Sequence, residues 1–183
     1  IRIHKMSPQT KITRRQCVQT ALLGTFSIGN QWVLATPMEA KSRKFVPTVL
    51  KSQQILVLER LAETLVPGSI DAGIAAYIDN QLSRGSESLL MAKYLNVTPL
   101  QQTDFYTNAI NNTAIALKKS KSTMQAVIEK MFNDSVEGWQ GAPASFFLFL
   151  LRADGLDVTY GTEAGADLLD IPYNPHISPE SNW

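Results

Sequence analysis

Apolar residues recur along this chain mainly at the spacing of amphipathic helices, and few stretches alternate with period two. A segment at 144–153 is apolar on almost every side, which favours a central core helix over a helix that meets a partner. The pattern predicts an all-α fold, a small irregular bundle of about five to six helices with a long non-regular C-terminal tail. Besides 144–153, helices are expected over 52–66, 71–82, 87–95, 98–118 and from 122 past 131.

Cap and turn residues set the expected limits of these elements. Thr98-Pro99 followed by Gln101 is typical of a helix start with a capping box. Residues 36–48, with two prolines and a charged run, are expected to be a linker that precedes a helical domain at 49–154.

The segment 155–183 is rich in turn residues and also carries apolar and aromatic groups. Such a tail is expected either to wrap around its own bundle or to lie along another chain. We therefore assign it as an irregular partner-binding tail. The residues expected to bind the partner are Tyr160, Tyr173 and Trp183 of the tail and Phe146 and Phe149 of the aromatic helix, with packing inside the chain as the alternative for each.

Residues 1–35 have the three parts of a secretory signal of the twin-arginine type. Arg14 and Arg15 lie in its basic part, a mildly apolar stretch follows at 21–28, and Val33-Leu34-Ala35 resembles a small-residue cleavage site. Because that route carries folded proteins, we expect a periplasmic protein that meets the twin-arginine translocase. The alternatives are a basic arm that binds an acidic surface and an uncleaved apolar segment that acts as an anchor.

The charge is divided unevenly. Residues 1–35 contain five Lys or Arg and no acid, so the rest has 12 Lys or Arg against 16 Asp or Glu and a net charge near −4, although the whole chain is +1. The mild basicity therefore belongs to the leader, and binding of nucleic acid is not expected.

Few residues of the predicted mature part could carry chemistry. Its one histidine is His176, and the only cysteine of the chain, Cys17, lies in the leader, so no metal, thiolate or covalent haem site is expected. Paired carboxylates can hydrolyse glycosides, and Asp154, Asp157 and Glu163 would need a common pocket to do so. Acidic residues in turns more often serve solvation and capping, so we expect a non-enzyme. A stand-alone periplasmic helical binding protein for a small ligand is the alternative.

Three runs of this chain resemble the gluconate 2-dehydrogenase subunit 3 family. The first is a helix that ends in Val66-Pro67, and the second passes through Ala72-Gly73 to Ile78-Asp79. The third matches that family's aromatic helix followed by Leu-Arg. The resemblance covers roughly residues 50–172 and rests on 56–67, 71–79 and 146–152.

The resemblance implies a non-catalytic small accessory subunit of a membrane-associated, FAD-dependent sugar or sugar-acid dehydrogenase. In such complexes FAD belongs to a large subunit of the glucose–methanol–choline (GMC) type, which is exported bound to the small one. Electrons then pass to a cytochrome c, on a third subunit or a separate protein. This chain would hold no cofactor itself and would act in a chaperone-like manner.

The sequence departs from the family after Arg152. Many members continue with a Gly-Gly-Asn segment and a tryptophan, whereas this chain has 157–165 and then Ile171-Pro172-Tyr173. The substrate of the complex therefore stays open among gluconate, a glucoside and a free sugar, including oxidation of a ring hydroxyl such as C3.

Overall fold

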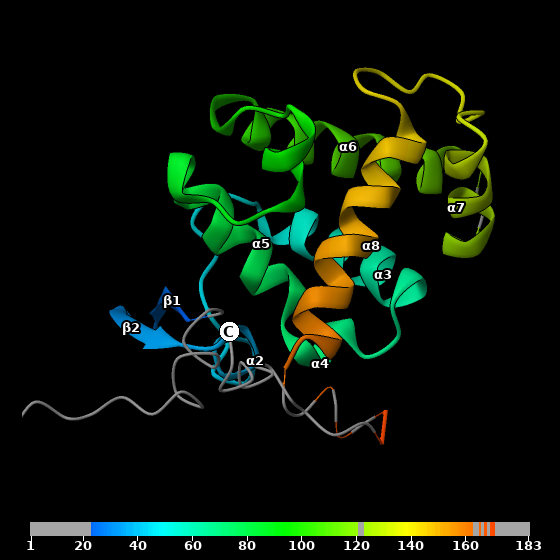
Figure 1. Cartoon of the computed structure of the whole chain (residues 1–183). Coiled ribbons are helices and arrows are strands. Elements are labelled where there is room, and N and C mark those ends of the chain that lie inside the picture. The colour runs from blue at the N-terminus through cyan, green and yellow to red at the C-terminus, as the bar shows by residue number, and fades with distance from the viewer. Residues whose placement is uncertain (1–22, 121–122, 163–164, 166, 168, 171–183) are drawn as a thin grey trace, which may run out of the picture.

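The computed structural model describes residues 23–120 and 123–162, together with 165, 167, 169 and 170. Most of them are helical, as predicted, but the fold is not purely α because a two-stranded sheet precedes the helices (Figure 1). The strands are β1 (Gly24–Ile28) and β2 (Gln31–Ala35). The helices are α2 (Pro37–Ser42), α3 (Ser52–Leu65), α4 (Ser69–Ala72), α5 (Ile74–Ser83), α6 (Pro99–Ser120), α7 (Met124–Phe132) and α8 (Ala144–Tyr160), with short 3-10 helices η1 (Gly85–Glu87) and η2 (Met91–Leu95).

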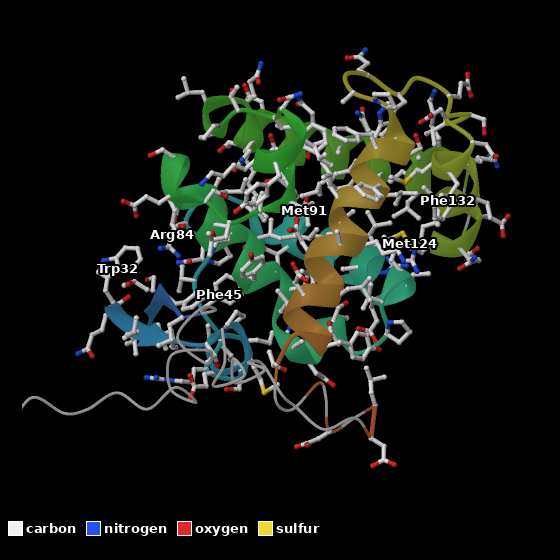
Figure 2. The ribbon with its side chains drawn as sticks, viewed as in Figure 1. Trp32, Phe45, Arg84, Met91, Met124 and Phe132 are labelled. Carbon is white, nitrogen blue, oxygen red and sulfur yellow. The ribbon has the colours of Figure 1, made fainter. Side chains whose placement is uncertain are left out.

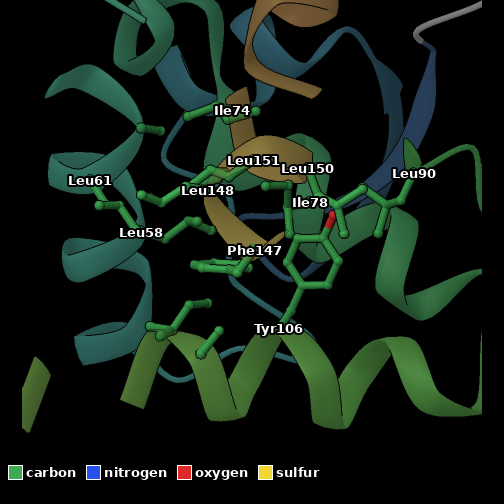
Figure 3. Packing of buried hydrophobic residues seen from close by; sticks show 14 of the residues in the cluster. Leu58, Leu61, Ile74, Ile78, Leu90, Tyr106, Phe147, Leu148, Leu150 and Leu151 are labelled. Carbon is green, nitrogen blue, oxygen red and sulfur yellow. The ribbon is translucent and has the colours of Figure 1, made fainter. Parts of the chain in front are cut away.

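Helix α8 is the centre of the packing, as its uniformly apolar sequence predicts. It contacts α3, α4, α5, α6, α7 and η2. Its buried side, which includes Phe147 and Leu151, meets Leu58 of α3, Ile78 of α5 and Tyr106 of α6 (Figure 3). The remaining members are mostly aliphatic side chains, from the helices and from the segments that connect them, so one contiguous cluster holds the bundle together.

The predicted tail begins later than expected. Helix α8 does not end near 154 but continues through Gly155 to Tyr160. Val158 and Thr159 are buried, and a Cβ at Gly155 would lie 3.3 Å from Cγ2 of Val66. The last turns are therefore kept helical by close packing against the chain that follows α3. The sequence alone did not indicate this, because Gly155 is more typical of a turn than of a helix interior.

The predicted helix start at Thr98 is confirmed. Helix α6 begins directly after Thr98, whose backbone N–H donates to Oε1 of Gln101 at 3.2 Å. The expected helix over 87–95 is instead two short 3-10 helices separated by Ser88, Leu89 and Leu90.

The sheet is a tight hairpin formed by residues assigned to the leader. Gly29 and Asn30 form its two-residue turn, both with positive φ (55° and 63°), which is typical of the turns that join twisted strands. Phe26 and Ile28 alternate toward the interior, where they form a second cluster with Ala35, Ala40 and Ala76. The hairpin contacts α2 and α5, so the helical bundle is not the whole fold (Figure 1).

The predicted linker at 36–48 contains helix α2, which is a second correction. Thr36 accepts a hydrogen bond from the Glu39 backbone N–H at 3.2 Å, and the Thr36 N–H donates to Oε2 of Glu39 at 2.8 Å. This capping box compensates for the short length of the helix. An ion pair between Lys41 and Glu59 then links α2 to α3.

A buried carboxylate organises the chain between α2 and α3. Asp79 on α5, 2 % exposed, accepts hydrogen bonds from the backbone N–H groups of Thr48, Val49 and Leu50 at 2.7–2.9 Å, and from the Thr48 hydroxyl at 3.0 Å. These donors precede the first turn of α3, so Asp79 fixes where that helix begins relative to α5.

Across the described residues, none of the helices is both long enough and apolar enough to cross a membrane.

Candidate functional site

One face of α8 is turned away from the bundle although several of its side chains are apolar. Phe149 is 57 % exposed, and Leu156, two turns further along the same face, is 40 % exposed. Arg152 lies exposed between them, and Tyr160 ends the stripe. We call these four residues the α8 stripe. Large side chains on one exposed face of an otherwise well-packed helix are typical of a surface that another chain covers.

The residues predicted to bind a partner fall into three groups. Phe149 lies on the α8 stripe, where a partner can reach it. Phe146 is half-buried, and its ring packs edge-on against Phe105 with 5.8 Å between the ring centroids. Tyr160 is also half-buried, and its hydroxyl donates to the Pro67 carbonyl at 3.2 Å, which ties the end of α8 to the chain after α3. Tyr173 and Trp183 lie outside the described residues.

Of the predicted export-signal residues, only Ala35 lies in the part of the chain that the structure describes. Arg14 and Arg15 lie outside the described residues. Ala35 ends strand β2 and is only 2 % exposed, with its Cα paired with that of Gly24.

A second apolar surface was missed by the sequence analysis. Trp32 and Leu34 point outward from β2, each 67 % exposed, and Val46, which bridges to Ser27 beside them, is exposed as well. We call these three residues the hairpin face. Trp32 lies at the outer edge of the molecule, away from the helices (Figure 2). The alternation of Phe26 and Ile28 with polar residues, followed by Gly29-Asn30, was the sequence signal that could have revealed the hairpin.

Among the acidic residues that the structure describes, the one with the largest pKa shift, Asp154, is buried in the bundle. Asp154 on α8 is 1 % exposed, and it accepts hydrogen bonds from the Met91 backbone N–H at 2.9 Å and the Tyr106 hydroxyl at 2.7 Å. Burial raises the pKa of Asp154 to about 6, because these two donors do not replace the lost hydration of the charged form. Burial and the nearby Asp154 charge also raise the pKa of Tyr77.

This carboxylate is placed for structure and not for contact with a substrate. Asp154 links α8 to α6 and to the start of η2, and both of its oxygens are occupied. Asp157 lies one turn further along α8 on the exposed side, where partial burial raises the pKa of its carboxyl group. Glu163, the third acid of the proposed hydrolytic set, lies outside the described residues. Asp154 and Asp157 therefore do not face one open site as a glycoside hydrolase needs.

A small pocket lies between α6 and the segment before α8. It has a volume of about 40 Å³ and is lined by Phe105, Asn108, Ala109, Trp139, Phe147 and residues 140–142. Pockets for small-molecule ligands usually have volumes of about 300–1,000 Å³, so this one is far too small for a sugar. Within the described part of the chain, no three His, Cys, Asp or Glu side chains converge as a group that could hold a metal ion.

The residues that carry the family resemblance have structural roles here. Glu63 accepts hydrogen bonds from the backbone N–H groups of Gly68 and Ile70 at 2.9 and 3.0 Å. These bonds lower the pKa of its carboxyl group, and the bond from Gly68 has the larger effect. Gly73 adopts a φ of 85° where a Cβ would lie 2.2 Å from the Pro37 carbonyl oxygen. With Asp79, they set the path of the chain from α3 to α5.

Compared with family models, with curated proteins and with solved structures, the chain matches none of them.

Proposed function

We propose that this chain is the non-catalytic small subunit of a periplasmic, FAD-dependent sugar or sugar-acid dehydrogenase complex. The α8 stripe is the observation that carries the proposal. It places Phe149 and Leu156 on the outer side of the helix that organises the core, so a partner bound there contacts an element held in place by most of the other helices. A few buried large side chains supply most of the binding energy of such interfaces.

In this proposal the chain binds, stabilises and exports the large subunit. The large subunit is of the GMC type and holds FAD, and electrons leave it for a cytochrome c. Arg14 and Arg15 address the assembled complex to the twin-arginine translocase. The family resemblance of 56–67, 71–79 and 146–152 supports these roles. Glu63 and Asp79, which lie in these runs, stabilise the scaffold on which the stripe is presented. Gluconate, a glucoside or a free sugar remains the candidate substrate class.

The test is recovery of the complex from cells that make both chains. The protein tagged at its C-terminus is purified from the periplasm, and the absorbance of the product is scanned for flavin. We expect a much larger co-purifying chain with flavin bands. A colourless, well-behaved monomer would contradict the proposal and favour a stand-alone periplasmic binding protein.

The contribution of the stripe is tested with matched variants. Phe149→Gln with Leu156→Gln should weaken capture of the flavoprotein at least about tenfold, because each buried interface side chain of this kind contributes on the order of 1–2 kcal/mol. The control is Leu100→Gln on α6, which changes a 93 % exposed leucine and should leave capture unchanged. Unfolding temperatures should stay close to the wild type in both variants. Equal capture by all forms would move the interface away from α8.

A further inference from the structure

The predicted cleavage site lies inside a folded element. If a signal peptidase cut after Ala35, it would have to recognise the small side chains of Ala35 and Val33, one and three residues before the cut. In the hairpin both residues point to the inner face, where Ala35 is buried and Val33 packs against the second cluster. The outward positions are Trp32 and Leu34 instead. The side chains that define the site are therefore hidden while the strands are paired.

The peptide bond after Ala35 is also held on both sides. Ala35 pairs with Gly24 across the hairpin. The next residue, Thr36, donates its N–H to Glu39 and accepts a bond from the Ala40 N–H at 2.9 Å as the cap of α2. A protease needs the residues around its scissile bond in an extended, unpaired form, so the hairpin and the start of α2 must both open before cleavage.

Removal of residues up to Ala35 would damage the remaining protein. Phe26 and Ile28 fill the second cluster, and without them the fully buried Ala40 and Ala76 become exposed. The Asn80 side-chain amide donates to the Thr25 carbonyl at 2.8 Å, and the Val46 N–H donates to the Ser27 carbonyl at 2.7 Å. Both donors would lose their partners.

The sequence of this segment also fits a hairpin better than the apolar part of a signal. Gly24 lies so close to Asn80 that a Cβ there would be 2.5 Å from its Oδ1 atom. Polar Thr25 and Ser27 alternate with Phe26 and Ile28, as a half-buried strand requires. A signal's apolar region needs neither this alternation nor a turn with two positive φ angles.

We propose that residues 23–35 remain attached as a permanent part of the folded protein, and that any removal of the leader occurs before Leu23. This inference does not rest on the proposed function, because it concerns only the hairpin and its contacts. It can hold or fail whether or not a flavoprotein partner exists.

The first experiment exposes the purified full chain to a purified signal peptidase, with an unstructured peptide of residues 21–42 as the control. The products are identified by intact mass. We expect the folded chain to keep residues 23–35 whether or not the peptide is cut after Ala35. A folded chain that is cut after Ala35, with Thr36 as its new N-terminus, would overturn the inference.

The second experiment compares Phe26→Ser with Trp32→Ser in the full chain. Phe26 is buried and Trp32 is exposed on the same hairpin, so only the first change should disturb the fold. Phe26→Ser should lower Tm on the order of 10 °C or prevent folding, whereas Trp32→Ser should change it by less than about 2 °C. Where Phe26→Ser still folds and the 21–42 peptide is cut after Ala35, the variant should become sensitive to the peptidase at Ala35. An unchanged Tm and unchanged resistance for Phe26→Ser would refute a structural role for the hairpin.

Discussion

Two buried aspartates, Asp79 on α5 and Asp154 on α8, are surrounded very differently. Asp79 accepts four hydrogen bonds, three of them from consecutive backbone N–H groups, at 2.7–3.0 Å. Asp154 accepts two, from Met91 and Tyr106. Both are almost fully buried, so the number of donors and not the depth of burial separates them.

The comparison shows how the number of hydrogen-bond donors differs between two equally buried carboxylates. Four donors compensate a carboxylate for most of its lost hydration, and the bonds in turn fix the segment before α3. With two donors the compensation is incomplete, and the pKa of Asp154 rises to about 6. The packing of α8 against α6 and η2 is therefore expected to depend on pH through Asp154.

The largest expected effect comes from removing the tie at α5. Asp79→Ala leaves the buried N–H of Leu50 and its two neighbours without their acceptor, so the free energy of unfolding should fall by about 3–5 kcal/mol. Asp104→Ala, at an exposed position on α6, is the matched control and should stay within about 0.5 kcal/mol. Denaturant unfolding measures both. A loss below about 1 kcal/mol for Asp79→Ala would show that Asp79 does not organise this connection.

The second prediction concerns the pH dependence that Asp154 produces. Its pKa is raised from 3.8 to about 6 in the folded state, so the folded protein binds more protons than the unfolded chain between these values. The stabilising contribution of protonated Asp154 is complete below about pH 4 and is lost as the pH rises through about 6. The expected size is about 3 kcal/mol at most.

Asp154→Asn isolates this contribution, because asparagine does not titrate. We expect the difference in unfolding free energy between the wild type and Asp154→Asn to change steadily from pH 4 to 6.5 and to level off above. Denaturant titrations at several pH values measure it. A constant difference over that range would contradict the raised pKa.

A smaller effect is expected at the phenol that donates to Asp154. Tyr106→Phe removes one of the two donors and should cost about 1–2 kcal/mol near neutral pH, where Asp154 is ionised. It should also raise the pKa of Asp154 further, because the Tyr106 hydrogen bond lowers it. The falling part of the pH profile should therefore extend to higher pH. A profile identical to the wild type would mean that Tyr106 does not influence the charge on Asp154.

Much of the helical framework could be predicted from the chain because it rests on local signals. The apolar stripe that includes Leu58 and Leu61, and the cap at Thr98, each act within one or two turns. The hairpin was missed because its small and apolar residues, at 21–28 and 33–35, also fit a leader.

The candidate interaction surface was predicted in part. An apolar helix at 144–153 was expected, and Phe149 was named as a residue for partner contact, but the same pattern fitted Phe146, which packs against Phe105. Which phenylalanine faces outward depends on where α3, α6 and α7 lie around α8, and periodicity within α8 does not contain that information.

The sequence by itself determined the helical character of the bundle, the capped start of α6 and the central place of the aromatic segment, because these depend on neighbours a few residues apart. Only the tertiary structure decided that Gly155 continues a helix, that Ala35 is buried and that the pKa of Asp154 is raised. Each of these depends on groups distant along the chain, namely Val66 for Gly155, Ala76 for Ala35, and Met91 and Tyr106 for Asp154. Hydration, close approach and hydrogen bonding across such distances exist only once the chain has folded.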